Sequence, residues 1–560
     1  MKKDDSPNQP TNHINFWVCT GLLVILLSST LAREIDRPFY GLHSWGQATG
    51  AWVARTHVKY GLRYTKGLST WAVGDPPPAH PKRYVDHPQL GGLLAWAAGC
   101  IFGIHEWTWR VVNLITSIGI LLFFLRILRG LLDEKTTLLA GLLFILFPIT
   151  GYFTAGGWSV LFGFMALWFY LVLIRSLNDG PEPALRHRIG LAASLFLGLQ
   201  IAWTGFFLAF AVGLHYVCKC IKRKQFPEKN LLAILILAPF SSLLIDFTIM
   251  AASYGWDFQK IIDLFIWRSA KGELTGQMQK FDWGLWFAKL WEFSITDFTL
   301  PVLIIAIVYL TFGQLFVFME TKPDKKDGRR TRQFPQFWLF TIPAVTQLLV
   351  LRGALWRHQT WLHPLDPIVA IAAASGIMLL ADILKKVHKT LADISIIALV
   401  AVSAAFCFAG TDYYYSIRWQ APAKIEMFKM LNQRIPPDKA LLSFEDFIVD
   451  QHESKGAFYR PEIAWYLDRE IVTAGVIKDG KLMVAETVAD IEQKARTGRF
   501  PFYLILRVAP LVPLINQLGQ RYEYEYIPGE PGATTKDGKF LKAGMPDYIL
   551  FDLNRKVVEQ

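Results

Sequence analysis

Eleven apolar runs dominate the first 411 residues of this 560-residue chain, and each is long enough to cross a lipid bilayer as a helix. Hydrocarbon offers no hydrogen-bond partners, so the peptide groups of each crossing must bond within their own helix. The composition agrees, with 52% hydrophobic residues and a mean hydropathy of +0.29. We therefore predict a mainly α, multi-span membrane protein. The predicted crossings are 15–32, 109–129, 136–153, 158–176, 189–203, 205–220, 230–252, 298–318, 335–351, 364–384 and 391–411.

A further apolar run, 89–104, decides the parity of the count. It is short, rich in Gly, and bounded by Pro88 and His105. We predict an interfacial or re-entrant helix here and not a crossing. The count then stays at eleven, and the two ends of the chain lie on opposite sides of the membrane.

Basic residues between the crossings predict the orientation. The positive-inside rule places these loops, and with them the N-terminus, in the cytoplasm. The first run ends in Ser-Thr-Leu-Ala like a signal peptide, but the many later runs favour an uncleaved anchor. We expect a multi-pass protein of a cell membrane, such as the bacterial inner membrane, with its C-terminus outside. The basic residues are Arg126, Arg129, Lys135, Arg186, Arg188, Lys219, Lys222, Arg223, Lys224, those in 322–332, Lys385, Lys386 and Lys389.

The polar region 412–560 follows the membrane domain, 1–411. It alternates strand-like runs (KALLSF, REIVTA, FYLILRV, DYILFDL) with helical stretches such as AETVADIEQKARTG, which predicts an extracytoplasmic α/β domain. Its charges nearly balance, with 20 Lys and Arg against 21 Asp and Glu, so the net charge of +12 belongs to the membrane part. No basic-aromatic motif indicates a nucleic-acid partner. None of the five cysteines lies in this region, so it has no disulfide framework.

The first outer loop, 33–88, carries eight Lys and Arg and begins with two carboxylates, Glu34 and Asp36. Residues 45–60 have apolar side chains at helical spacing, with Arg55, His57 and Lys59 among them. This pattern predicts an amphipathic helix at the outer surface, where its cations can meet lipid phosphates. Asp36 could instead simply pair with a neighbouring arginine, Arg33 or Arg37.

The stretch YVDHPQLGGLL, 84–94, holds Asp86 and His87 where the chain enters apolar sequence. Ionisable residues at such a boundary are costly and usually functional. Pro88 suits the first turn of the predicted re-entrant helix, and Asp86 could alternatively serve only as its cap.

These motifs, in this order, resemble a family. An acidic motif after the first span, followed by His87-Pro88-Gln89-Leu90-Gly91, is similar to the dolichyl-phosphate-mannose protein mannosyltransferases, which have an Asp-Glu pair and then Asp-Val-His-Pro-Pro-Leu-Gly-Lys. The stretches HSWGQATGAWVART and FGIHEWTWRVVNL resemble bacterial polyprenyl-phosphate-dependent glycosyltransferases of the GT-C class, including lipid A aminoarabinose transferases. The Asp of the pair matches Asp36, whereas its Glu, the second Pro and the Lys have no match.

The resemblance implies a GT-C-like fold and an inverting transfer of sugar from a polyprenyl-phosphate donor, at the outer face, to a protein, lipid or glycan acceptor. Asp36 would be the base, assisted by Glu34. Residues expected to bind the substrate are His43, Arg55, Lys59, Asp86, His87, Arg352, Arg357 and His358. His43 could instead be a histidine packed near Trp45, and Arg352 a snorkelling side chain.

Several features leave alternatives open. The pair Glu34 and Asp36 could hold a divalent cation, but two carboxylates make a weak site, so we predict no certain cofactor. Asp246 lies inside an apolar run and is either functional or a paired structural residue. The aromatic-rich loop 253–297 is a candidate lid. A transporter or flippase of lipid-linked sugars is the second functional hypothesis, and a non-catalytic scaffold is the third.

Overall fold

The computed structural model of the chain describes residues 13–152, 157–179, 184–268, 281–313, 334–357, 359–445, 448–451, 457–479, 481–534 and 540–557. They form two compact units. The first, here called the helical unit, comprises Met1–Ile35, Val85–Gly91 and Arg110–Tyr414. The second, here called the mixed unit, comprises Asp36–Tyr84, Gly92–Trp109 and Tyr415–Gln560.

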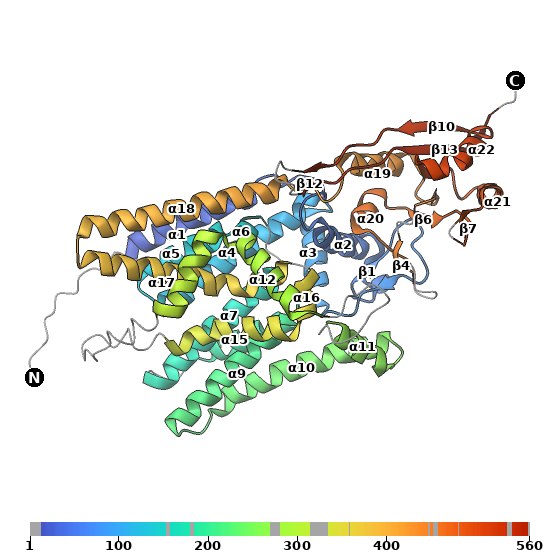
Figure 1. Ribbon diagram of the computed structural model, residues 1–560. Coiled ribbons are helices and arrows are strands. Elements are labelled where there is room, and N and C mark those ends of the chain that lie inside the picture. The colour runs from blue at the N-terminus through green and yellow to red at the C-terminus, as the bar shows by residue number, and fades with distance from the viewer. Residues whose placement is uncertain are drawn as a thin grey trace, which may run out of the picture. The chain divides into compact units, whose positions relative to one another are not determined.

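A helix lies at every position where the sequence predicts a crossing (Figure 1). Long helices account for most of the helical unit, and α5 packs against α1 and α17, while α8 packs against α7 and α10. The helices are α1 (His13–Leu31), α4 (Glu106–Arg129), α5 (Glu134–Leu146), α6 (Pro148–Tyr152), α7 (Gly157–Asp179), α8 (Leu185–Leu199), α9 (Thr204–Arg223), α10 (Lys229–Ser253), α11 (Phe258–Arg268), α12 (Trp283–Phe298), α13 (Leu300–Val308), a π-helical turn (Tyr309–Gly313), α15 (Phe334–Val350), α16 (Arg352–Arg357), a 3₁₀ helix (Gln359–Leu365), α17 (Asp366–Lys385) and α18 (Lys389–Ser416).

Among the described residues, six helices are long and apolar enough to cross a membrane, or seven if one bent pair is a single span. The protein is therefore a multi-pass membrane protein, and the count of eleven crossings remains a prediction. The predicted re-entrant run forms α3 (Leu90–Phe102), a helix of only 13 residues. That length is short for a crossing.

Local sequence explains where several helices begin, break and bend. The side chain of Asp133 accepts hydrogen bonds from the backbone N–H groups of Lys135 and Thr136 and so caps α5. Pro148 separates α5 from α6 within one predicted crossing. Thr299, with φ of 65°, separates α12 from α13, and the two helices meet at a bend of 109°. The candidate lid contains α11 and α12, and its middle, 269–280, lies outside the described residues.

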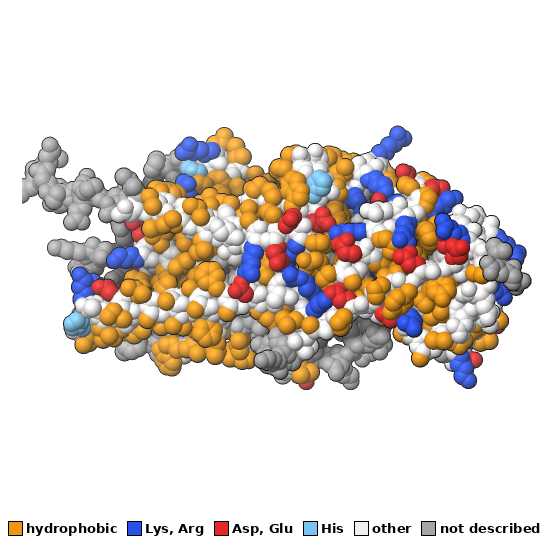
Figure 2. All heavy atoms as spheres, turned by 90° about the horizontal axis from the view of Figure 1, so that it is seen from above, with side chains coloured by type: hydrophobic (Ala, Val, Ile, Leu, Met, Phe, Trp, Pro, Cys, Tyr) orange, Lys and Arg blue, Asp and Glu red, His pale blue; other side chains and the backbone are white. Residues whose placement is uncertain are grey.

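The surface of the helical unit is apolar. Figure 2 shows hydrophobic side chains over much of it. Large hydrophobic side chains on the outside include Leu22, Phe240 and Ile397, which are 60%, 62% and 69% exposed. Water would penalise such a surface, whereas lipid does not.

The mixed unit is built on a five-stranded sheet with strand order β10-β13-β9-β3-β6. Strand β3 (Ala440–Ser443) is parallel to β6 (Glu470–Thr473) and β9 (Phe502–Leu506). Strand β13 (Tyr548–Lys556) is antiparallel to β9 and to β10 (Tyr522–Ile527). The helices of this region are α19 (Pro422–Arg434), α20 (Pro461–Leu467), α21 (Val484–Arg496) and α22 (Val512–Gly519). The predicted α/β character is confirmed.

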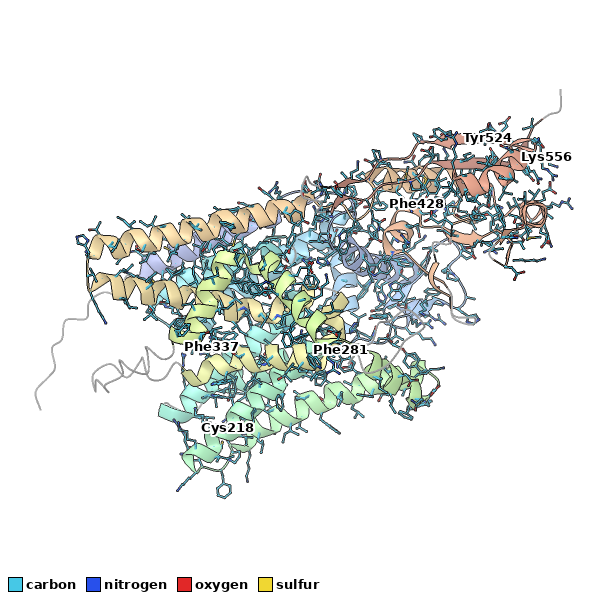
Figure 3. All side chains as sticks on the ribbon, in the orientation of Figure 1. Cys218, Phe281, Phe337, Phe428, Tyr524 and Lys556 are labelled. Atoms are coloured by element: carbon cyan, nitrogen blue, oxygen red, sulfur yellow. The ribbon has the colours of Figure 1, made fainter. Side chains whose placement is uncertain are left out.

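All four strand-like runs named from the sequence are strands of this sheet, and its helix α21 was also expected. The short paired strands are β1 (Thr70–Trp71) with β2 (Lys82–Arg83), β4 (Ile448–Gln451) with β5 (Ala457–Tyr459), β7 (Ile477–Lys478) with β8 (Lys481–Leu482), and β11 (Ala533–Thr534) with β12 (Phe540–Lys542). Edge strand β10, with sequence YEYEYI, was not predicted. Its Tyr524 is 59% exposed, in contrast to the fully buried Phe428 of α19 (Figure 3).

The predicted amphipathic helix is α2 (Ser44–Thr65), with a kink at Gly61, and it packs against α20. Residues 36–84 and 92–109 therefore belong to the same compact unit as 415–560. The predicted domains, 1–411 and 412–560, placed the first outer loop with the membrane helices, and that division remains a prediction.

A buried carboxyl group lies where α2 meets α20. Glu462 is 1% exposed, and its Oε1 accepts a hydrogen bond of 2.8 Å from the hydroxyl of Ser44. Burial raises the pKa of Glu462 above its ordinary value of 4.5, although the hydrogen bonds it accepts oppose the shift. The folded protein therefore holds this proton more tightly than the unfolded chain. The corresponding stability is present below pH 4.5 and is lost as the pH rises toward the folded pKa.

Glu462→Gln should remove this pH dependence, since an amide does not ionise. The thermal midpoint of the variant, relative to wild type, should rise as the pH increases from about 5 to about 8. Glu530→Gln is the matched control. Burial tends to raise the pKa of Glu530, but hydrogen bonds from Lys542 and the Ala423 N–H outweigh it and lower that pKa. The difference in thermal midpoint between Glu530→Gln and wild type should stay constant over the same pH range. Parallel curves for Glu462→Gln and wild type would contradict the assignment.

The predicted orientation can be tested with single cysteines in a chain whose five native cysteines are replaced. Lys386, between α17 and α18, and Lys481, in β8, are both exposed. A membrane-impermeant maleimide should label cysteine at 481 in intact cells and cysteine at 386 only after permeabilisation. The reverse pattern would place the mixed unit in the cytoplasm and overturn the topology.

Candidate active site

Asp36 is the first residue of the mixed unit and lies in the short connection that follows α1. Its side chain is exposed, and within the described part of the chain its carboxylate makes no hydrogen bond or ion pair. The two arginines considered as its partners are engaged elsewhere. Arg33 pairs with Asp412, and Arg37, which is 8% exposed, lies with its guanidinium 5.1 Å from the ring centre of Tyr415. The carboxylate of Asp36 is therefore exposed and is not paired with either arginine.

Glu34 and His43 lie on either side of Asp36 along the chain. Glu34 is exposed and has a φ of 54°. His43 is 7% exposed and precedes α2. It packs against Trp419, with ring centres 5.1 Å apart and an edge-to-face arrangement. The structure thus places His43 in a packed aromatic environment, and its role in substrate binding remains a prediction.

Arg55 is directed at the end of α20. Its guanidinium donates to the carbonyl oxygens of Trp465 and Ala464, at 2.6 and 2.8 Å, and lies 3.3 Å from the carboxylate of Asp468. The last carbonyls of a helix have no partner within the helix, so a cation there satisfies them. Burial lowers the pKa of Arg55, and Asp468 opposes that shift. The donors of this predicted phosphate ligand are thus engaged within the mixed unit.

Lys59, one turn further along α2, reaches the same carboxylate. Its Nζ lies 2.7 Å from Oδ2 of Asp468 and 3.1 Å from the carbonyl oxygen of Gly74. Arg55 and Lys59 together therefore neutralise Asp468. Both remain predicted substrate ligands, but they would have to leave these partners to bind a phosphate.

The segment Val85–Gly91 belongs to the helical unit. The hydroxyl of Tyr254 donates to the carboxylate of Asp86, and Nε1 of Trp203 donates to the carbonyl oxygen of Asp86 at 2.8 Å. The N–H of Leu90 donates to the carbonyl oxygen of Gln200 at 3.1 Å. Asp86 and His87 are both partly exposed. The break between α8 and α9, together with the end of α10, therefore holds the segment that carries both residues.

Asp246 belongs to this network through Gln200. It is 3% exposed, and Nε2 of Gln200 lies 3.4 Å from its Oδ1 and 2.7 Å from the hydroxyl of Ser242. The backbone oxygen of the same Gln200 accepts from Leu90. Asp246 is thus connected to the Asp86 segment through one glutamine. The sequence indicated Asp246 and the helix break separately, but not Gln200 or Tyr254, because neither residue type stands out at a helix end.

Of the three predicted ligands around position 355, the structure describes the side chain of Arg352. Its guanidinium lies 4.6 Å from the ring centre of Phe281 and 5.0 Å from that of Trp283. Trp286 donates to its carbonyl oxygen at 3.2 Å. Only the backbone of Arg357 is described, and His358 lies outside the described residues.

The helical unit also holds two buried polar clusters that the sequence did not predict as such. In one, Tyr414 donates to Oδ1 of Asp297 at 2.6 Å, and Gln359 donates to both. In the other, Nδ1 of His363 lies 2.8 Å from Oδ2 of Asp366. Asp297 lies two residues before the bend at Thr299, so the first cluster ties that bend to the end of α18.

The predicted site residues are divided between the two units, and their roles remain predictions. Asp36, His43, Arg55 and Lys59 belong to the mixed unit, whereas Glu34, Asp86, His87 and Arg352 belong to the helical unit. Among the described residues, no group of three or more His, Cys, Asp or Glu is arranged to hold a metal ion.

Comparison with known proteins gives a fold but no sequence family. No known family model matches the chain, and no curated protein matches its sequence. The chain does match a crystal structure of ArnT from Cupriavidus metallidurans bound to undecaprenyl phosphate. The TM-score is 0.57 at 12% identity, over 96% of this chain and 98% of that one.

A second match is the archaeal oligosaccharyltransferase AglB from Archaeoglobus fulgidus, in complex with an inhibitory peptide and a dolichol-phosphate. Here the TM-score is 0.51 at 12% identity, over 95% of this chain and 74% of that one. An apo form of the archaeal oligosaccharyltransferase gives 0.51 at 11% identity. The chain therefore has the fold of these proteins, and the GT-C-like fold expected from the sequence is confirmed.

Proposed function

We propose that the protein is a membrane glycosyltransferase that transfers a sugar from a polyprenyl-phosphate donor to an acceptor at the outer face of the membrane, with Asp36 as the base. The observation that carries this proposal is the fold match with ArnT over nearly the full length of both chains. Both ArnT and AglB were seen with a polyprenyl phosphate, undecaprenyl in one and dolichol in the other. The sequence motifs around Asp36 and His87 support the same class independently.

In the proposed reaction an acceptor hydroxyl oxygen attacks the anomeric carbon of the sugar. A new C–O bond forms as the bond from that carbon to the phosphate oxygen breaks, and polyprenyl phosphate leaves with its electron pair. Asp36 takes the proton of the acceptor. The support for this role is that its carboxylate is exposed and has no cationic partner among the described residues. A strong ion pair would lower its basicity.

The leaving phosphate needs nearby cations. We assign this role first to Arg352, whose guanidinium is in contact with two aromatic rings and with no carboxylate of the described chain. A planar guanidinium can donate two hydrogen bonds to a phosphate while it remains stacked. Arg357 and His358 are further candidates from their place in the sequence. Asp86 and His87 would contact the donor from their segment beside Trp203.

A transporter or flippase of lipid-linked sugars is the competing class. The bend of 109° between α12 and α13 is compatible with it, because broken helices are common in transporters. The end-to-end match with ArnT favours the transferase. A flippase would move the intact lipid-linked sugar, whereas a transferase releases polyprenyl phosphate, so the products separate the two.

Asp36→Asn should reduce sugar transfer by about 10²–10⁴-fold, the usual contribution of a positioned base. The assay would supply a panel of polyprenyl-phosphate-linked sugars to membranes that contain the protein and would measure polyprenyl phosphate released. Glu34→Gln should have a smaller effect, because the resemblance matches only Asp36 to the acidic pair.

Asp412→Asn is the matched control, because it removes another exposed carboxylate near the end of a predicted crossing. It should leave the transfer rate within a few-fold of wild type, with a comparable thermal midpoint in detergent. Normal turnover by a folded Asp36→Asn protein would refute the assignment of the base.

A further inference from the structure

The region that follows the last membrane helix makes many contacts with the loop that begins at Asp36. Its short helix α20 spans seven residues, Pro461–Leu467, and all seven are buried. It meets the first outer loop at four places. Its residues contact Phe39, Ser44 and Arg55, and Asp468, at its end, contacts Lys59.

Among the contacts with α20, the one nearest to Asp36 in sequence is a hydrogen bond from the backbone. The N–H of Phe39 donates to the hydroxyl oxygen of Tyr466 at 2.7 Å. The Phe39 ring is 1% exposed and packs edge-to-face on Trp465, with ring centres 5.5 Å apart. Both the backbone and the side chain at 39 are therefore held by α20, only three residues after the proposed base.

Neighbouring residues restrain the same stretch. Arg37 stacks on Tyr415, and the carbonyl oxygen of Tyr40 accepts a hydrogen bond of 3.0 Å from the N–H of Gln420. Gly41 and Arg418 form an isolated antiparallel bridge. The loop is thus restrained at 37, 39, 40 and 41 by residues of 415–466, while the carboxylate of Asp36 stays exposed.

In this arrangement the backbone that follows Asp36 is held in place, while the carboxylate of Asp36 stays exposed. A base contributes to catalysis only when it lies within hydrogen-bond reach of the proton it removes. Errors of about 1 Å in such positions can cost about a hundredfold in rate. A loop held at four consecutive or nearly consecutive positions has little freedom to make such errors.

We propose that Tyr466 is a positioning residue for the transfer reaction, because its hydroxyl, through the Phe39 N–H, fixes the backbone that presents Asp36. The C-terminal region is then a working part of the enzyme and not an appended domain. This inference rests on the proposed function, since it assumes that Asp36 is the base.

The test compares two Tyr→Phe variants of the full-length protein. Tyr466→Phe removes the acceptor of the Phe39 N–H. Tyr503→Phe is the matched control, because Tyr503 is fully buried in the same unit and its hydroxyl bonds to a backbone group, the carbonyl oxygen of Ala474, at 3.1 Å. Both variants lose one buried hydroxyl that bonds to the backbone, but only Tyr466 contacts the Asp36 loop.

Two readouts are needed. Hydrogen–deuterium exchange of a peptide covering 37–42 should be at least about tenfold faster in Tyr466→Phe and unchanged in Tyr503→Phe, because only the former frees the Phe39 amide. In the transfer assay, kcat should fall about tenfold in Tyr466→Phe while KM for the lipid-linked donor stays within twofold. Tyr503→Phe should keep the wild-type kcat and KM, even if its thermal midpoint falls as far as that of Tyr466→Phe.

Each outcome bears on the proposal. Unchanged exchange in Tyr466→Phe, or faster exchange with unchanged kcat, would overturn the positioning role and leave the proposed function intact. An equal loss of kcat in both variants would assign the effect to general destabilisation and would also overturn it. Failure of the proposed function has a different signature, which is normal turnover by Asp36→Asn.

Discussion

Peptide groups that leave helical geometry inside an apolar protein must find hydrogen-bond partners, and this constraint shapes the helical unit. The chain satisfies it by joining two irregular segments. The segment that carries Asp86 meets the break between α8 and α9, so that the N–H of Leu90 bonds to Gln200 and the carbonyl of Asp86 accepts from Trp203. Asp246 then anchors Gln200 from α10. The need to pair backbone groups therefore explains why the Asp86 segment meets this break, and the same contacts hold the segment that carries Asp86 and His87.

At a second irregularity, the bend at Thr299, buried polar groups are also paired with one another. Asp297, Gln359 and Tyr414 bond to one another around it, although they come from α12, the 3₁₀ helix and α18. Buried polar groups of this kind are stable only when they are paired, and their pairing specifies one arrangement of the helices. We infer that this cluster stabilises the bend between α12 and α13.

Much of the fold could be predicted because local sequence patterns indicate its helices and strands. Hydrophobic periodicity and length located each helix that matches a predicted crossing, and short apolar runs located β3, β6, β9 and β13. Strand β10 was missed because its Glu residues interrupt any such apolar run. The pairing of the first outer loop with α20 could not be predicted. It depends on contacts between residues more than 400 positions apart, such as Arg55 with Trp465, and no local pattern encodes them.

In the candidate site too, local sequence features could be predicted, and contacts between distant residues could not. Asp36 could be proposed as the base from its place after the first span, and among the described residues its carboxylate has no partner. Arg55 and Lys59 were read from the sequence as surface cations, because their spacing on α2 gives no sign of Asp468. Their charges stabilise the contact between α2 and α20 by pairing with Asp468. For the donor phosphate we therefore propose Arg352 first, because its guanidinium contacts two aromatic rings and no carboxylate of the described residues.

Recognition of a polyprenyl phosphate by the protein can be tested by a binding measurement, without knowledge of the sugar or the acceptor. The thermal midpoint of the purified protein in detergent would be measured with undecaprenyl phosphate, with undecaprenol, and with a nucleotide sugar. A ligand that binds only the folded state raises the midpoint as its concentration increases. We expect that undecaprenyl phosphate raises the midpoint, that undecaprenol has little effect, and that Arg352→Ala weakens the response. Equal shifts with the phosphate and the alcohol, or a shift with the nucleotide sugar alone, would contradict it.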